Sequence, residues 1–406
     1  MRAPVPRRGK KESGLRLWPV GPVLALAFAA ALLVASSVFY AGWDLLGARD
    51  IKTERRIDSK TLFDLVKLAF GVVAGAGALV ALVVAYRRQR LDEDGALRDA
   101  TRLHTERFTT AVSQLGDDSA AVRLGGVHAL AGLADDAPTR ELRQTCIDVL
   151  CAYLRLPYTA EADLPADDAA ARHAYLSLRE VRHTVIRVIR DRLRLDAEHA
   201  HSWQGHDFDF TNVTFDGGDF SGSVFSSGMV NFAGATFCGG MVHFAEATFS
   251  GGVVNFAGAM FSGGTTSFDS STFSGSSVQF HKTRFTDSKV RFRMANFSGG
   301  KVSFAGATFS GATVSFHRAA FSGATVNFHR AAFSRGAVSF AGATFAVGTV
   351  SFTGAAFSGS TLHLGRARFC GGVADMSNVQ GETSPGLIPP FPPGLILPTA
   401  WQPPET

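Results

Sequence analysis

The chain has 406 residues and a formal net charge of +5, with 46% hydrophobic and 18% charged residues. A wholly disordered chain needs low hydrophobicity and high net charge, so this composition excludes that class. Four cysteines are too few for a scaffold built on disulfides. Arginine outnumbers lysine by 32 to 8, a bias that is typical of GC-rich bacterial genomes.

The N-terminal region predicts a membrane-spanning helix. A basic cytoplasmic tail over residues 1–16 precedes Val20–Tyr40, a long stretch without a charge. A helix of about 20 apolar residues can cross the hydrocarbon core of a bilayer, so we predict a first transmembrane helix at 17–43. The alternative is a cleaved signal peptide, but this apolar stretch is longer than such a peptide needs.

A second uncharged stretch runs from Leu68 to Tyr86. It predicts a second transmembrane helix at 62–86, joined to the first by an external loop at 44–61. The alternative is a buried helix of a soluble domain. The length of the stretch and its small residues Gly75 and Gly77 favour a span.

The distribution of basic residues predicts the orientation of both spans. Basic residues stay on the cytoplasmic side of a membrane. Six lie in the N-terminal tail and three lie within residues 87–90, although five in the loop weaken the bias. We therefore expect a multi-pass protein of the bacterial plasma membrane with both termini in the cytoplasm.

Residues 87–204 predict a small helical domain. Ser119 can cap one helix, Asp136 and Pro138 favour the start of the next, and Asp167 and Asp168 suit the start of a third. The stretch 121–135 resembles one armadillo or HEAT-type repeat helix, without a second copy. Cys146 and Cys151 lie on the second of these helices, where buried packing is the default for Cys146.

The last predicted helix of this domain is rich in arginine. Two interpretations are open, either contact with anionic lipid or nucleic acid, or a solvated face with acidic partners such as Glu180 and Asp191. We favour the solvated face. The arginines are Arg179, Arg182, Arg187, Arg190, Arg192 and Arg194.

A phenylalanine repeat begins at Phe208 and extends to Phe369, a segment that holds 28 of the 34 Phe residues. The spacing is five residues at first and then alternates between five and seven, without an insertion. One unit is Val302-Ser-Phe304-Ala-Gly-Ala-Thr-Phe309-Ser-Gly. Val and Phe two positions apart share one face of a strand, and Ser-Gly supplies a turn. A fixed short period of this kind predicts a β-solenoid.

The segment Phe210-Thr-Asn-Val-Thr-Phe215-Asp-Gly-Gly-Asp-Phe220 and the recurrent Ala-x-Phe-Ser-Gly resemble pentapeptide-repeat proteins. The resemblance covers residues 205–378. It implies a mainly β fold, a right-handed, four-sided β-solenoid, here of the membrane-anchored, actinobacterial type. The two-residue extension of alternate units departs from the family pattern.

The spacing leaves two possible coils, made of either one repeat unit or two. A 12-residue coil has an interior too thin for two Phe rings and a Val without strain, so we prefer a 24-residue coil. On that scheme Phe244, Phe268 and Phe292 stack in one column. With coils about 4.8 Å apart, roughly seven coils make a rod on the order of 35 Å long. The helical domain can cap the first coil.

No group of residues in the repeat predicts a chemical site. The histidines lie in outward columns without paired carboxylates, and Cys238 and Cys370 replace a serine of the repeat. The sequence lacks a phosphate loop, a Gly-x-Ser-x-Gly elbow and zinc-ligand spacing. We therefore predict no catalytic, cofactor-binding or metal-binding residues, no cofactor, and no enzyme activity. The histidines concerned are His243, His281, His317, His329 and His363.

Some pentapeptide-repeat proteins imitate DNA with an acidic rod and bind type II topoisomerases. Residues 205–378 hold eight acids and eleven Lys or Arg, so their net charge of +3 has the wrong sign for that role. A basic stretch from Lys282 to Lys301 can meet an acidic partner or lipid, although a solvated patch is the simpler interpretation. The proline-rich tail, 379–406, predicts an extended, disordered segment.

Together these features predict a membrane-anchored, non-enzymatic scaffold that presents its solenoid to an unknown protein partner or to a second copy of itself. Nucleic acid is not the expected partner. The alternatives are a modulator of topoisomerases or nucleic acid, and an envelope sensor in which the loop at 44–61 or the spans detect a signal.

Overall fold

The computed structural model describes residues 59–165, 167–381, 391 and 393–402, together with nine scattered positions among the first 58. The predicted tail at 1–16 lies outside the described residues, and so does most of the predicted span at 17–43 and of the loop at 44–61. The chain forms two compact units, Met1–Ala100 and Thr101–Thr406.

Helix α2, Ser59–Leu115, contains the second predicted span. Within the described residues it is the one helix that is long and apolar enough to cross a membrane. Leu68, Phe70, Val73 and Leu82 are all more than 60% exposed. The helix continues past the predicted domain boundary at residues 86 and 87, because no proline or capping residue stops it there.

Three further helices follow in the second unit, as the sequence predicts. They are α3 (Ala120–Asp135), α4 (Arg140–Arg155) and α5 (Ala169–Leu193), with a 3₁₀ turn η1 (Glu161–Asp163) between the last two. Asp168 caps α5 by accepting a hydrogen bond from the Ala171 amide at 2.9 Å. The cap of α4 differs from the prediction, because Thr139 accepts a hydrogen bond from the Leu142 amide at 3.3 Å.

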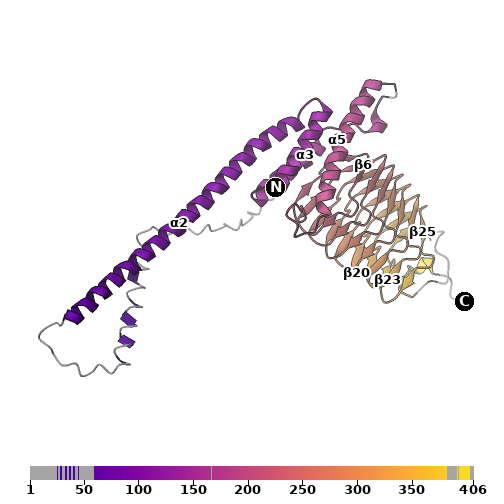
Figure 1. Cartoon of the computed structure of the whole chain (residues 1–406). Coiled ribbons are helices and arrows are strands. Elements are labelled where there is room, and N and C mark those ends of the chain that lie inside the picture. Colours follow the sequence, from indigo (N-terminus) through magenta and orange to yellow (C-terminus); the bar gives the residue numbers. More distant parts are fainter. Residues whose placement is uncertain are drawn as a thin grey trace, which may run out of the picture. The chain divides into compact units, whose positions relative to one another are not determined.

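The rest of the second unit is a parallel β-solenoid of about seven turns, and strand labels run away from the helices along it (Figure 1). Its strands form three sheets. The 14-stranded sheet contains β1 (Phe208–Asp209), β4 (Val224–Phe225), β5 (Met229–Asn231), β8 (Thr248–Phe249), β9 (Val253–Asn255), β12 (Thr272–Phe273), β13 (Ser277–Gln279), β16 (Asn296–Phe297), β17 (Lys301–Ser303), β20 (Ala320–Asn327), β23 (Thr344–Ser351), β26 (Arg368–Phe369), β27 (Val373–Asp375) and β29 (Leu395–Ile396).

The two remaining sheets have eight and seven strands. The eight-stranded sheet contains β2 (Thr214–Phe215), β6 (Thr236–Cys238), β10 (Met260–Ser262), β14 (Arg284–Thr286), β18 (Thr308–Ser310), β21 (Ala332–Ser334), β24 (Ala356–Ser358) and β28 (Gln380–Gly381). The seven-stranded sheet contains β3 (Gly218–Asp219), β7 (Met241–His243), β11 (Thr265–Ser267), β15 (Lys289–Arg291), β19 (Thr313–Ser315), β22 (Ala337–Ser339) and β25 (Thr361–His363).

The register of the strands confirms the 24-residue coil. Val230 pairs with Val254, and Phe261 pairs with Phe285, so each strand meets the strand 24 positions later. The first coil is two residues shorter, since Phe208 pairs with Val230, where the phenylalanine spacing is still five. The right-handed, four-sided winding stays a prediction.

Stacked phenylalanine rings fill the interior of the solenoid. In the predicted column, Phe244 and Phe268 have ring centroids 4.9 Å apart, and Phe268 and Phe292 have centroids 4.8 Å apart, with interplanar angles of 7° and 6°. Every Phe from 208 to 357 is buried. Burial of each ring stabilises the fold by about 1.5–3 kcal/mol, and ring pairs at these distances add to that.

Several turns in each coil place a residue in the left-handed backbone region, and in two of these turns φ lies between 53° and 69°. We call the two stacks of these residues the corner columns. The first corner column contains Asn212, Gly234, Gly258, Lys282, Gly306, Arg330 and Gly354, and the second contains Gly222, Glu246, Ser270, Met294, Arg318, Gly342 and Arg366.

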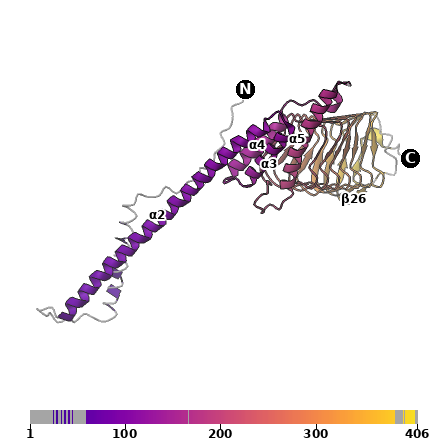
Figure 2. The same ribbon diagram turned by 45° about the horizontal axis from the view of Figure 1, so that its top comes forward.

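The two ends of the solenoid are covered by different parts of the chain. Helices α3, α4 and α5 gather at the first coils (Figure 2), where α4 contacts β1 and α5 contacts β3. At the other end β29 pairs with β27, and Trp401, in the 3₁₀ turn η2 (Thr399–Trp401), is buried against the Phe357 ring with centroids 5.7 Å apart.

This second cover differs from the predicted disordered tail. The indole of Trp401 donates a hydrogen bond to the Gly381 carbonyl at 3.2 Å, and Leu397 is also buried. Prolines such as Pro398 keep this segment extended, and the apolar side chains beside them close an end that would otherwise expose unpaired strand edges.

Candidate functional site

The outer surface of the solenoid carries short polar side chains in columns that repeat with the coil. The Asn255 amide donates a hydrogen bond to the Asn231 side-chain oxygen at 3.1 Å, and Asn231 donates to the Thr211 hydroxyl at 2.8 Å. Ser and Thr occupy most other outward strand positions. Because the interior is filled with rings and both ends are covered, the sides are the surface on which this part of the chain can bind a partner.

The structure does not bring the histidines of the repeat together. His281 and His329 precede residues of the first corner column two coils apart, and His317 precedes a residue of the second. His243 and His363 share a column of the seven-stranded sheet but lie five coils apart. Among the described residues no group of three His, Cys, Asp or Glu is placed to hold a metal ion.

The four cysteines are free thiols and lie apart in two regions. Cys146 and Cys151 are fully buried in α4, and burial raises the pKa of their thiols to about 11 and about 12. Both thiols therefore stay protonated at neutral pH. Cys370 is exposed and Cys238 is half-buried, each in the outward position that holds serine in other units.

The basic stretch from Lys282 to Lys301 forms a belt around one coil and is not a patch on one face. Arg284 lies on the eight-stranded sheet, Lys289 on the seven-stranded sheet and Lys301 on the 14-stranded sheet. Neighbours in sequence are therefore spread over several sides of the solenoid, whereas neighbours along one side come from successive coils.

The contact between the helices and the first coil contains a buried carboxylate. Asp216 accepts hydrogen bonds from the hydroxyls of Tyr158 and Tyr175, each at 2.6 Å. His183 and Arg179 lie 3.7 and 3.9 Å from its oxygens. Burial by itself would raise the pKa of Asp216, but the nearby His183 imidazole and the hydrogen bonds from the two tyrosines outweigh it and lower the pKa to about 2.

The same carboxylate changes the ionisation of its neighbours. Burial and the hydrogen bond to Asp216 raise the pKa of both Tyr158 and Tyr175, so both hydroxyls keep their protons. Arg182 is buried, donates to the carbonyls of Leu154 and Thr214 at 2.7 Å each, and lies over the Tyr158 ring. This cluster holds α5 on the solenoid, and we call it the polar latch. It consists of Tyr158, Tyr175, Arg179, Arg182, His183 and Asp216.

The arginines of α5 thus have a role that neither interpretation of the sequence included. Arg190 forms an ion pair with Asp219, and Arg194 donates to the Ser221 carbonyl at 2.6 Å. Arg192 pairs with Asp135 at 2.9 Å. The acidic partners that the sequence suggests are also present, because Arg187 lies near Glu180 and Arg190 contacts Asp191. The sequence missed the contacts with the solenoid, since they join residues that are distant in the chain.

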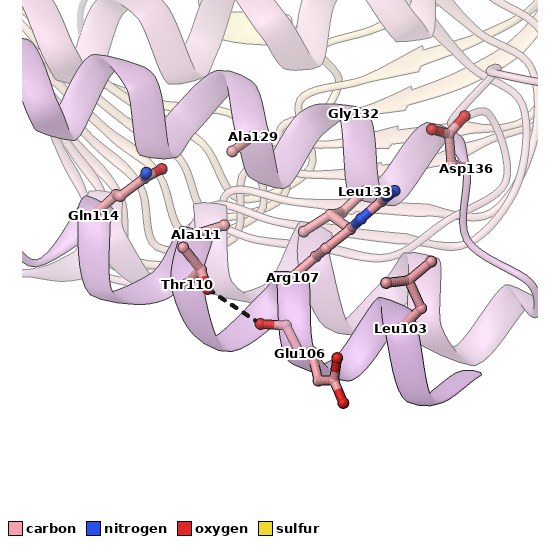
Figure 3. Close-up of a pocket in the computed structure, with 10 residues that line it drawn as sticks. All are labelled: Leu103, Glu106, Arg107, Thr110, Ala111, Gln114, Ala129, Gly132, Leu133 and Asp136. Carbon is pink, nitrogen blue, oxygen red and sulfur yellow. Dashed lines mark hydrogen bonds between the residues drawn. The ribbon is translucent and has the colours of Figure 1, made fainter. Parts of the chain in front are cut away.

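An open groove of about 460 Å³ lies between the end of α2 and α3. Gly126 of α3 touches the backbone of α2, because a Cβ there would lie 2.5 Å from the Leu115 nitrogen. Away from that contact the helices leave a space with apolar and charged walls (Figure 3). Its lining consists of Leu103, Glu106, Arg107, Thr110, Ala111 and Gln114 of α2, Ala129, Gly132 and Leu133 of α3, and Asp136.

Comparison with known families supports the resemblance seen in the sequence. Residues 210–260 match the family model described as pentapeptide repeats (9 copies). A search of curated proteins and a search of solved structures each found no match. The matched residues form the first coils, and the same 24-residue register continues to the pairing of β24 with β28. The solenoid of this chain therefore contains pentapeptide repeats.

Proposed function

We propose that this protein is a membrane-anchored, non-enzymatic scaffold that presents the sides of its solenoid to a protein partner in the cytoplasm. The observation that carries the proposal is that both ends of the solenoid are covered and its interior is packed with rings, so that the side faces are its accessible surface. A solenoid of pentapeptide repeats is the kind of structure that suggests a protein-interaction module.

The membrane anchor is supported by α2. Its apolar side chains between Val66 and Tyr86 are largely exposed, and an exposed apolar surface of this length is costly in water. Three arginines follow at 87, 88 and 90, which favours a cytoplasmic location for the rest of the chain.

Alkaline extraction of membranes tests the anchor. The full chain should stay in the membrane pellet at high pH. A variant that lacks residues 17–43 and carries Leu82→Arg and Val73→Arg should move to the supernatant, because one predicted span is removed and two charges disfavour the other. Release of the unaltered chain would contradict the anchor.

The exposed Cys370 offers a direct test of orientation. A membrane-impermeant maleimide should label it only after lysis, and a Cys370→Ser variant should lose that signal, because the other three thiols are buried or half-buried. Labelling in intact cells would place the solenoid outside and contradict the proposed orientation.

Photocrosslinking tests the scaffold role. A photoreactive amino acid is placed at one exposed position at a time. Thr308 lies on the eight-stranded sheet, Thr313 on the seven-stranded sheet and Thr325 on the 14-stranded sheet. At least one of these should give a discrete protein adduct in cells, whereas the same probe at Glu180, exposed on α5, is the control. Adducts from Glu180 alone would contradict binding by the solenoid.

A further inference from the structure

Charge is divided unevenly along the solenoid. Residues 205–276 hold six acids and no Lys or Arg, whereas residues 277–378 hold eleven Lys or Arg and two acids. We call 277–378 the distal coils. The small net charge of the whole solenoid therefore conceals a basic surface that is confined to the distal coils.

Three of the six acids in residues 205–276 form ion pairs or hydrogen bonds with the helical domain. Asp209 forms an ion pair with Arg155, Asp219 pairs with Arg190, and Asp216 belongs to the polar latch. In the distal coils, by contrast, one cation has an ion pair among the described residues, Arg291 with Asp269 at 3.0 Å. The other ten cations have no carboxylate partner in the described part of the chain, so their charge is available to a ligand.

The corner columns show that four of these cations are placed at an energetic cost. Lys282, Arg318, Arg330 and Arg366 have φ between 53° and 60°, a region that is unfavourable for any residue with a Cβ. Other coils have glycine at the same positions, for example Gly342 and Gly354. Glycine would relieve the strain, so stability does not explain the cations.

The alternation of glycine and cation also orders the long side chains. A Cβ at Gly342 would lie 3.4 Å from Cγ of Arg318, and a Cβ at Gly354 would lie 3.5 Å from Cγ of Arg330. Each arginine stem therefore lies across the glycine of the next coil. Two edges of the distal coils present their cations along the axis of the solenoid.

These observations select among possible anionic partners. The cations lie on three sheets and both corner columns, so a planar lipid surface could meet only part of them. The Phe rings of the distal coils point inward and offer no platform for stacking bases. The solenoid of a second copy has five acids outside the contacts described above, and they are dispersed over several coils: Asp207, Glu246, Asp269, Asp287 and Asp375. Asp269 already pairs with Arg291. An extended polypeptide needs only one corner column and can bring several carboxylates to it.

We infer that the distal coils bind an acidic polypeptide segment, whose carboxylates pair with Arg318 and Arg366 along the second corner column. Guanidinium groups suit this role because they bind carboxylates through two parallel hydrogen bonds. The inference rests on the proposed function in that it names the chemistry of the protein partner.

The test uses the full chain in zwitterionic detergent and a fluorescein-labelled peptide of alternating Glu and Gly. Fluorescence anisotropy should show binding that weakens as salt rises. A variant with Arg318→Gly and Arg366→Gly should bind roughly fivefold more weakly, from two lost surface ion pairs. The matched control, Ser270→Gly with Met294→Gly, changes the second corner column without removing a cation and should keep the affinity.

Thermal unfolding of the same variants shows whether each variant is still folded. The arginine-to-glycine variant should melt no lower than the unaltered chain, because glycine relieves the left-handed backbone. Equal peptide affinity in this variant and the control would overturn the inference. So would tighter binding to a short mixed-sequence DNA duplex, or to vesicles of equal parts phosphatidylcholine and phosphatidylglycerol, than to the peptide. Analytical ultracentrifugation gives a further test. Self-association of the unaltered chain that the arginine-to-glycine variant abolishes would also overturn the inference.

This measurement is independent of the membrane. Peptide binding by a chain that alkaline extraction releases would leave the inference standing and reject the proposed anchor. Retention of the anchor without peptide binding would reject the inference alone.

Discussion

The solenoid and the polar latch are stabilised in different ways. In the solenoid each coil repeats the same contacts, with rings such as Phe268 and Phe292 stacked 4.8 Å apart. At the latch a single carboxylate, Asp216, accepts from two tyrosines that come from separate segments of the helical domain. Stability in the first region is a sum of similar nearest-neighbour terms, and in the second it depends on one network.

This contrast indicates where the chain tolerates change. Outward positions of the repeat vary between Ser, Thr, Asn, Lys and Arg because each contributes little to the core. The latch has no duplicate, and a buried network that loses one member leaves its other polar groups without partners. Two pairs of substitutions and one pH series test the contrast.

The largest effect is expected from a ring in the middle of the solenoid. Phe292→Ala should lower the free energy of unfolding by about 4 kcal/mol, because it removes a fully buried ring and leaves a cavity in a close-packed column. Denaturant unfolding followed by circular dichroism measures it. Phe369→Ala, at the half-buried last ring, is the matched control and should cost less; equal costs would contradict a repeat of additive contacts.

A smaller loss is expected at the latch. Asp216→Ala should lower the free energy of unfolding by about 3 kcal/mol, since the hydroxyls of Tyr158 and Tyr175 then lose their acceptor. Glu246→Ala, at an exposed carboxylate of the next coil, should change it by less than about 0.5 kcal/mol. The same denaturant assay compares them, and similar values for both would show that the latch contributes no more than a surface group.

The smallest of the three effects is a pH dependence at the same junction. Burial, with help from Arg140 and Arg143, lowers the pKa of His206 to about 4, against about 6.5 in an unfolded chain. Between these two pKa values the histidine binds more protons in the unfolded chain than in the folded chain, so the free energy of unfolding falls as the pH falls. From pH 7 to pH 5 the fall should be about 2 kcal/mol.

His206→Gln isolates this contribution. In the variant the free energy of unfolding should depend less steeply on pH over the same range. Burial also lowers the pKa of His104, so His104 contributes a part of the pH dependence in both proteins. Asp216 stays charged throughout, because its pKa is about 2. An unchanged slope in the variant would assign the pH dependence to other groups.

The sequence predicts much of the solenoid because its contacts are local in the repeat. A spacing of five and seven residues, together with the volume of two rings and a valine, was enough to choose the 24-residue coil and the column of Phe244, Phe268 and Phe292. The caps of the helices were harder. The sequence predicts the start of α4 from Asp136 and Pro138, but Thr139 caps this helix, since more than one polar residue in the short connection can accept a hydrogen bond from a helix amide.

The surface could not be predicted in the same way. The stretch from Lys282 to Lys301 looks like one patch in the sequence, but the winding of the chain distributes it over three sheets. Arg318 and Arg366 are distant in the chain, yet they share one corner column two coils apart. Trp401 lies among prolines that suggest disorder, and its burial depends on the shape of the last coil.

The repeat, the coil length and the inward set of phenylalanines follow from the amino-acid sequence alone, because a fixed period imposes one environment on every equivalent position. The folded chain was needed to show how the arginines of α5 bind the first coil, how the last residues close the other end, and which cations share an edge. Those contacts join residues that are distant in the chain, and the geometry that brings them together exists only once the coils are stacked.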